Sequence, residues 1–154
     1  MKRRTFLQGT IASSMVGAAV SAGLLTPRMV LAAWPESAFK AKSVDDSMNA
    51  LYNSVNHSPS GDIKIKAPDI AENGAVVPIT VSTSLAKVES ISVLVEKNPS
   101  PLAADFKMAA NAEGFVSTRV KMGKTSDLIA IVKSGGKLFS AKKTVKVTIG
   151  GCGG

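Results

Sequence analysis

The sequence from residue 61 to residue 149 predicts a mainly β domain, an immunoglobulin-like antiparallel β-sandwich, and three observations favour this fold. Apolar and polar side chains alternate with a period of two in seven or eight short runs. Turn residues separate these runs, as at Asn98-Pro99-Ser100-Pro101. The run 128–132 is continuously apolar, which is typical of a strand covered on both faces. A two-residue period also fits a small β-barrel, so that alternative stays open at this point.

Residues 1–32 have the pattern of a twin-arginine export signal. Arg3 and Arg4 precede an apolar pair, and the apolar run 11–25 is shorter than the roughly 20 residues that a membrane anchor needs. Small residues in 30–32 predict signal cleavage before Ala33, and cleavage one residue further on fits nearly as well. Because no cysteine stands near this site, a lipoprotein is excluded. We therefore expect a soluble protein in the bacterial periplasm.

Residues 33–154 are expected to form a single domain. Its parts are a helical segment (33–60), the sandwich (61–149) and a flexible glycine-rich arm (150–154). The whole sequence carries a formal charge of +8, and four of those positive charges lie in residues 1–32 with no acid, which leaves +4 for the domain. Nucleic acid is not an expected partner, because no basic-aromatic interleaving accompanies this charge.

One helix is predicted near the start of this domain. Ser43 is the expected N-cap, with Asp46 three residues later. An apolar stripe at helical spacing follows, and it consists of Met48, Leu51, Tyr52 and Val55. Breakers in 56–61 end the helix. His57 has no second histidine and no nearby cysteine to share a metal with, so we expect a surface residue.

The expected strands follow in order. Pro78 indicates that its strand lies at an edge or contains a bulge, and Ser134-Gly135-Gly136 is typical of a tight hairpin turn. The strands are centred on Ile63 and Ile65, on 76–81, on Ile91, Val93 and Val95, on Phe106 and Met108, on Val116, Thr118, Val120 and Met122, on 128–132, on Leu138 and Phe139, and on Val145, Val147 and Ile149.

A group of lysines follows residue 132. The simplest interpretation of such a run is a strand face that is exposed to solvent. The more specific interpretation is a mild positive field that attracts small anions near the C-terminal segment. The group consists of Lys133, Lys137, Lys142, Lys143 and Lys146.

Cys152 is the only cysteine, and two glycines stand on each side of it: Gly150, Gly151, Gly153 and Gly154. Glycine has no side chain to pack and the widest backbone freedom, so this thiol cannot be a buried core cysteine. An exposed free thiol oxidises and cross-links readily, which indicates that a chain keeping one makes use of it. Three residues beyond Ile149 let Cys152 reach about 10 Å from the fold.

Catalysis by the chain itself is not expected. A nucleophilic cysteine needs a base and a group that orients the base, and a glycine arm cannot hold such a geometry. The sequence has no metal-ligand cluster, haem attachment pair or phosphate loop, so no cofactor is predicted. The glycine arm therefore offers only a mobile backbone and one thiol sulfur, and a covalent carrier needs these two features.

The segment 150–154 resembles the tail of the Y subunit of the Sox sulfur-oxidising system, on which thiosulfate is processed. The similarity extends to Pro68–Gly74 with the following Val76-Val77-Pro78, to Glu96–Pro101 with Phe106, and to Ser117-Thr118-Arg119. It covers nearly all of residues 33–154 and includes the export signal. Lys2 departs from the Ser or Thr that is usual before the arginine pair.

The resemblance implies a set of partners and a site. Cys152 would be the covalent attachment point, the four glycines the swinging arm, and no residue catalytic. A Z subunit without its own signal would form a heterodimer with the chain and be exported with it. The c-type cytochrome SoxAX would load thiosulfate, the hydrolase SoxB would release sulfate, and the sulfane dehydrogenase SoxCD, where present, would oxidise the remaining sulfur.

Three alternatives to a carrier share parts of this sequence pattern. An exported structural sandwich could dimerise through a Cys152–Cys152 disulfide, which could equally link two carrier heterodimers. The ubiquitin-like sulfur carriers also end in Gly-Gly, but they are short cytosolic proteins and the predicted signal argues against them. A prenylation box needs a cysteine fourth from the end, and Cys152 is third.

Overall fold

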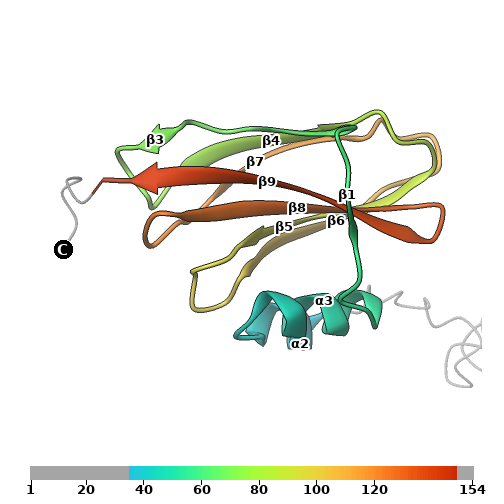
Figure 1. The fold of residues 1–154 in the computed structure, drawn as a ribbon, viewed down its shortest axis with the longest axis horizontal. Helices are drawn as coiled ribbons and strands as arrows, with labels where there is room; N and C mark the ends of the chain where they lie inside the picture. The colour runs from blue at the N-terminus through green and yellow to red at the C-terminus, as the bar shows by residue number, and fades with distance from the viewer. Residues whose placement is uncertain (1–34, 149–154) are drawn as a thin grey trace, which may run out of the picture. The chain divides into compact units, whose positions relative to one another are not determined.

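The computed structural model describes residues 35–148, which belong to one compact unit (Figure 1). The predicted signal, with Arg3 and Arg4, and the segment 149–154, with Cys152 and its four glycines, lie outside the described residues.

Within residues 35–148, nine strands form two sheets that face each other. The larger sheet has the order β1 (Ser58–Pro59), β9 (Lys137–Val147), β8 (Ser126–Ser134), β5 (Val88–Val95), β6 (Leu102–Lys107), and β3 (Ile70–Ala71) pairs with another part of β9. The smaller sheet has the order β2 (Ile63–Lys66), β4 (Val77–Thr83), β7 (Phe115–Val120). Because the two sheets are separate, the predicted sandwich is confirmed and the barrel alternative is wrong.

The main core fills the space between the two sheets. Alternate residues of each strand point inward, as the period of two requires. This core includes Ile63, Val77, Ile79, Val81, Ile91, Val93, Val95, Val116, Val120, Leu128, Ala130, Val132 and Val145.

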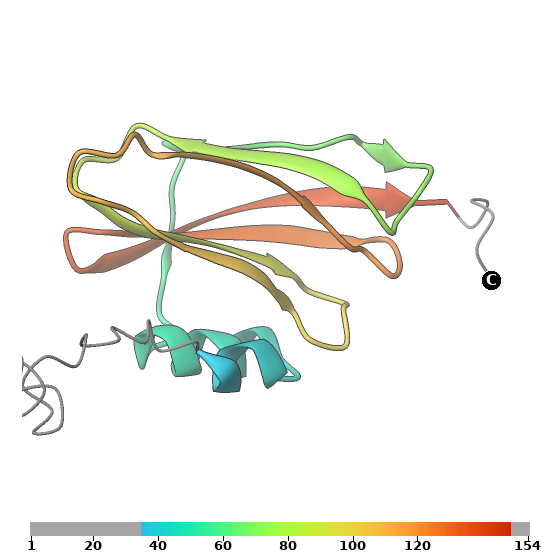
Figure 2. The same ribbon diagram turned by 180° about the vertical axis from the view of Figure 1, so that it is seen from behind.

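Two helices cover the outer face of the larger sheet, and both views of the ribbon show them on that side (Figures 1 and 2). They are α2 (Glu36–Lys40) and α3 (Val44–Tyr52). Met48 and Ala38 pack there against Ile129 and Ile131, in a second buried cluster. The run 128–132 is therefore covered on both faces, as predicted.

The start of α3 is as predicted and its end is not. The Ser43 side chain accepts a hydrogen bond from the Asp46 N–H at 3.0 Å. The helix ends at Tyr52, because Asn53 adopts a left-handed conformation with φ 52°. Val55 therefore lies beyond the helix and is 39% exposed. The sequence analysis predicts one helix, whereas the structure also has the five-residue α2. Neither described helix has the length and hydropathy to cross a membrane.

The strands differ from the predictions in three details. β9 is one strand of eleven residues, where the sequence indicates two. The two-residue strands β1 and β3 pair with β9 in parallel, within an otherwise antiparallel fold. Pro78 lies in β4, the middle strand of its sheet, but the pairing with β2 stops at Thr80. Pro78 is thus at a local edge, where its missing N–H leaves no bond unmade.

Candidate functional site

The predicted attachment site lies outside the described residues, but the structure describes the point from which its segment continues. Val147 donates its N–H to Oγ1 of Thr125 at 3.0 Å. Thr148 donates its N–H to the carbonyl oxygen of Ala71 at 3.1 Å, and Lys146 donates to that of Asp69 at 2.9 Å. The end of β9 is therefore held on both sides, by β3 and by the loop before β8. We call Lys146–Thr148 the root.

Three loops lie at the same end of the sandwich as the root: 72–76, 96–101 and 121–125 (Figure 1). The strand pairing requires this arrangement. Ser126, at the start of β8, pairs with Val145, near the end of β9, and the end of β5 pairs with the same part of β8. The strand after loop 72–76 likewise begins opposite the last residue of β7. Two of these loops carry segments on which the family resemblance rests.

Hydrogen bonds tie these loops to one another. The Asn98 side chain donates to the carbonyl oxygen of Lys121 at 2.7 Å and accepts from the Gly123 N–H at 3.1 Å. Met122 donates its N–H to the carbonyl oxygen of Gly74 at 2.7 Å. A Cβ added at Gly74 would overlap the Met122 carbonyl oxygen and lie 2.8 Å from Cγ1 of Val147. The root therefore rises from a closely packed base.

Cations outnumber acids in these loops and the root, taken together. Lys97, Lys121, Lys124 and Lys146 are exposed there, against two exposed acids, Glu72 and Glu96. The sequence analysis missed the three loop lysines because they come from two strand connections that are adjacent only in the fold.

The lysines that the sequence analysis grouped together do not share one location. Lys133 and Lys137 flank the β8–β9 turn, at the opposite end from the root. Lys133 forms an ion pair with Glu89 at 3.0 Å, and Lys143 forms one with Asp69 at 3.0 Å. The solvated strand face is thus the better description of this group.

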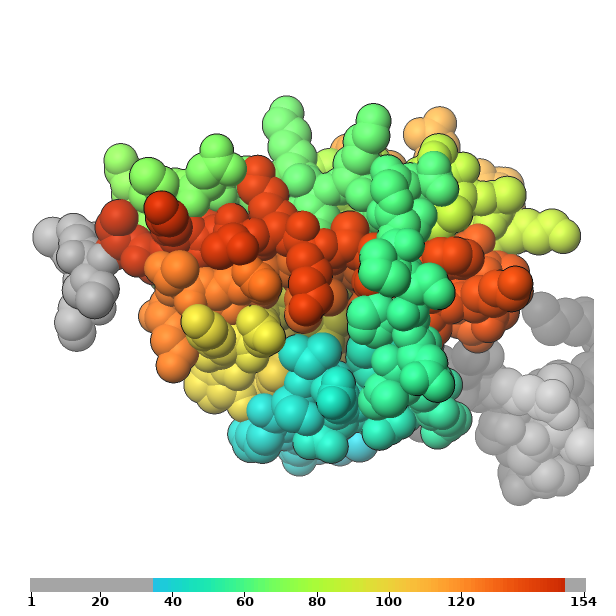
Figure 3. Space-filling model, in the orientation of Figure 1, coloured from blue at the N-terminus to red at the C-terminus, as the bar shows by residue number. Residues whose placement is uncertain are grey.

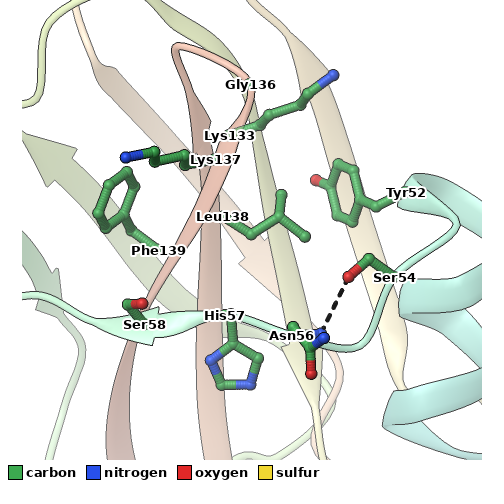
Figure 4. Close-up of a pocket in the computed structure, with 10 residues that line it drawn as sticks. All are labelled: Tyr52, Ser54, Asn56, His57, Ser58, Lys133, Gly136, Lys137, Leu138 and Phe139. Atoms are coloured by element: carbon green, nitrogen blue, oxygen red, sulfur yellow. Dashed lines mark hydrogen bonds between the residues drawn. The ribbon is translucent and has the colours of Figure 1, made fainter.

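A second feature that the sequence analysis missed is an open pocket of about 360 Å³ beside the β8–β9 turn (Figure 4). The connection after α3 crosses β9 here and forms one wall, as the space-filling view shows (Figure 3). His57 lines this pocket half-buried, and its Nδ1 lies 2.8 Å from Oγ of Ser140. The prediction of a surface residue therefore understates how firmly the imidazole is held. Only the final fold shows that it faces a pocket.

Two side chains near this pocket have shifted pKa values. Burial raises the pKa of Tyr52, although hydrogen bonds with Ser90 and Ser92 act in the opposite direction. The pKa of Glu89 is lowered by hydrogen bonds from Lys133 and from the Gly136 N–H. Among residues 35–148, no three His, Cys, Asp or Glu side chains are grouped closely enough to bind a metal ion.

Comparisons with known proteins agree with one another. The family model described as sulfur oxidation protein SoxY matches residues 48–152. The solved structure of the sulfur carrier protein SoxY from Chlorobium limicola f thiosulfatophilum is 44% identical, with 70% of this chain and 97% of that chain covered and a TM-score of 0.64. A superoxide reductase (neelaredoxin) from Ignicoccus hospitalis is 21% identical, with coverages of 56% and 80% and a TM-score of 0.50, which shows a shared fold alone. No curated protein matches.

Proposed function

Because this chain belongs to the SoxY family of sulfur oxidation proteins, we propose that it is a periplasmic sulfur carrier whose Cys152 holds the cargo covalently. The observation that carries this proposal is the extent of the family match, which runs through Cys152 itself. Cys152 is the fourth residue after the root, and Ile149, Gly150 and Gly151 stand between them. The chemistry of the carrier therefore takes place on the segment after β9 and not inside the sandwich.

The held root and the short segment define how this carrier works. Four residues at about 3.3–3.6 Å each let Cys152 lie at most about 14 Å from Thr148. An enzyme that accepts the thiol must therefore bring its own active site close to the root and the three loops around it. Glycine on both sides of Cys152 keeps the segment thin enough for a narrow entrance.

The proposed reaction sequence uses partner enzymes of known chemical class, and atoms and electrons balance at each step. A c-type cytochrome (SoxAX) removes two electrons as Cys152–SH and thiosulfate join, giving Cys–S–S–SO₃⁻ and one proton. A hydrolase (SoxB) adds water, so that sulfate and a proton leave and Cys–S–SH remains. A sulfane dehydrogenase (SoxCD), where present, oxidises that outer sulfur. A Z subunit completes the heterodimer. The twin-arginine signal of this chain, at Arg3 and Arg4, exports both subunits together.

The direct test is mass spectrometry of the peptide containing Cys152, isolated from cells supplied with thiosulfate. We expect adducts with the masses of a thiosulfonate and a persulfide. The Cys152→Ser variant should fold normally, lack these adducts and fail to support thiosulfate consumption. Thiosulfate consumption that is unchanged in this variant would overturn the proposal.

The alternative is an exported structural sandwich that dimerises through a Cys152 disulfide. A disulfide dimer can form in a carrier too, so dimerisation does not separate the two functions. Only free thiol and disulfide on the peptide, with no sulfur adduct, would favour the structural role.

The glycines around Cys152 give a further prediction. Valine at position 151 or 153 adds a branched side chain next to the thiol, which a narrow entrance would exclude. Gly151→Val and Gly153→Val should therefore lower turnover by the reconstituted enzymes at least about tenfold, since a misplacement of about 1 Å can cost that much or more. The melting temperature should stay unchanged. Full turnover in both variants would contradict the narrow entrance.

A further inference from the structure

The pocket beside the β8–β9 turn combines polar side chains that can donate hydrogen bonds with an apolar wall formed by Leu138 and Phe139. No carboxylate is among its lining residues, which are Tyr52, Ser54, Asn56, His57, Ser58, Lys133, Gly136, Lys137, Leu138 and Phe139. Figure 4 shows Leu138 near the centre of the pocket view, with Tyr52 on one side of it, Lys137 and Phe139 on the other, and the side chains of Asn56 and His57 extending downward below it. Its volume of about 360 Å³ lies within the range of roughly 300–1,000 Å³ that is usual for small-molecule sites.

Several of these donors have no protein partner within residues 35–148. Lys137 is exposed and forms no ion pair there. The Asn56 side-chain amide makes no hydrogen bond, since only its backbone N–H is bonded, to Oγ of Ser54. His57 uses Nδ1 toward Ser140, which leaves Nε2 available. A pocket with cationic and neutral donors and no acid favours an anion.

The neighbouring turn already holds an anion. Oε1 of Glu89 accepts the Gly136 N–H at 2.7 Å, and Oε2 lies 3.0 Å from Nζ of Lys133. Gly135 and Gly136 adopt φ values of 54° and 77°, and the Gly135 N–H donates to the carbonyl oxygen of Lys87 at 3.3 Å, so both turn amides are bonded within the protein. The turn therefore already binds a carboxylate, whereas Lys137 next to it has no ion pair within residues 35–148.

This pocket is separate from the covalent site. Phe139 in β9 and Thr148, the residue after β9, are nine residues apart, which is about 30 Å at roughly 3.3 Å per residue. Cys152 extends at most about 14 Å beyond Thr148. The thiol of one molecule therefore cannot enter the pocket of the same molecule.

From this geometry we propose that the pocket beside the β8–β9 turn is a non-covalent binding site for a small tetrahedral oxyanion of the sulfate or thiosulfate type. Lys137 and His57 supply the donors, and Leu138 and Phe139 supply an apolar wall for the less hydrated outer sulfur of thiosulfate. The choice of sulfur oxyanions rests on the proposed function, whereas the donor set does not.

The test is a titration of the reduced, ¹⁵N-labelled protein, followed by the amide signals of His57, Gly136 and Lys137. Sodium sulfate and sodium thiosulfate are the probes, and sodium chloride at equal ionic strength is the control. We expect saturable shifts with both oxyanions and none with chloride. Lys137→Gln should weaken binding by about fivefold to tenfold, because it removes one charge-assisted contact at a partly exposed site.

Two matched variants make the result decisive. Lys121→Gln removes an exposed lysine at the opposite end and should leave the titration unchanged. Cys152→Ser should also leave it unchanged, which separates this site from the proposed thiol chemistry. Shifts that grow linearly, that match those with chloride or that survive Lys137→Gln would overturn the proposal. Saturable binding of acetate alone would identify a carboxylate site instead and would equally contradict it.

Discussion

Tyr52 connects the helical layer to the larger sheet by more than apolar contact. Its hydroxyl makes hydrogen bonds with Ser92 and, at 3.2 Å, with Ser90. Ser92 in turn donates to Oδ1 of Asp105 at 2.7 Å. Lys107 lies 3.1 Å from the other oxygen of Asp105, and its Nζ is 5.8 Å from the centre of the tyrosine ring. One phenol thus completes a polar network beneath α3.

Tyr52→Phe should therefore lower the free energy of unfolding by about 1–2 kcal/mol, because it leaves the buried Ser90 hydroxyl without its partner and removes one of the two hydrogen bonds of Ser92. The variant also tests the raised pKa of Tyr52. A group that stays protonated in the folded state and ionises in the unfolded chain makes the protein less stable as pH rises above about 10. Denaturant titrations across pH 9–11 should show a smaller loss of stability in the variant. Equal losses in both proteins would contradict this role.

Gly74 is the residue whose substitution should act most directly on the root. Because an added Cβ would overlap the Met122 carbonyl oxygen and crowd Val147, Gly74→Ala should cost about 1–3 kcal/mol of stability. Gly61→Ala is the matched control, since a Cβ there meets nothing within 4 Å. Thermal unfolding compares the two variants. An equal melting temperature for both would mean that the loops shift without cost.

At this scale the sequence identifies the residues but not their partners. The apolar stripe correctly assigns Met48 and Tyr52 to the face of α3 that packs on the sheet. It does not reveal that the Tyr52 hydroxyl meets two serines from a strand that begins 36 residues later in the chain. The Ser43 cap is predictable because its partner, Asp46, is three residues away. Contacts between distant segments depend on strand register, which the alternation of side chains alone does not specify.

Among the described strands, β8 contributes the most buried side chains to the two cores taken together. Leu128, Ala130 and Val132 pack toward the smaller sheet, whereas Ile129 and Ile131 pack toward the helices. The continuous apolar run predicted this double burial. The same reasoning could not predict β1 and β3, because two-residue strands leave no periodic pattern and arise from pairing with β9.

Ile131→Ala should destabilise the protein by about 2–5 kcal/mol, because Ile131 is fully buried beneath the helices. Lys142→Ala, on the exposed side of β9, is the control and should change stability by less than about 0.5 kcal/mol. Chemical denaturation measures both variants. A small effect of Ile131→Ala would show that the helical layer can collapse into the space that is left.

In the whole molecule, the sandwich separates two ends of different character. One end presents the root among three connected loops, and the other presents the pocket beside the β8–β9 turn. Cys152 can be predicted as an attachment site from sequence, because its flanking glycines are a local pattern, and it stays a prediction. The loop lysines and the pocket could not be predicted, because each draws together residues from several separate segments.

The length of the segment after the root should matter as much as its thiol. Deleting Gly150 and Gly151 removes about 7 Å of reach, which is half of the distance available between Thr148 and Cys152. If the hydrogen-bonded loops around the root keep a partner's active site at its distance, turnover by the reconstituted enzymes should fall at least about tenfold. Inserting two further glycines before Cys152 should retain most activity, since longer flexible segments lose effective concentration only slowly. Thiosulfate-dependent cytochrome reduction measures both variants, and the melting temperature of each should equal that of the parent. A deletion variant with full activity would mean that partners meet the thiol in the open, and the sandwich would then have no part in presenting it.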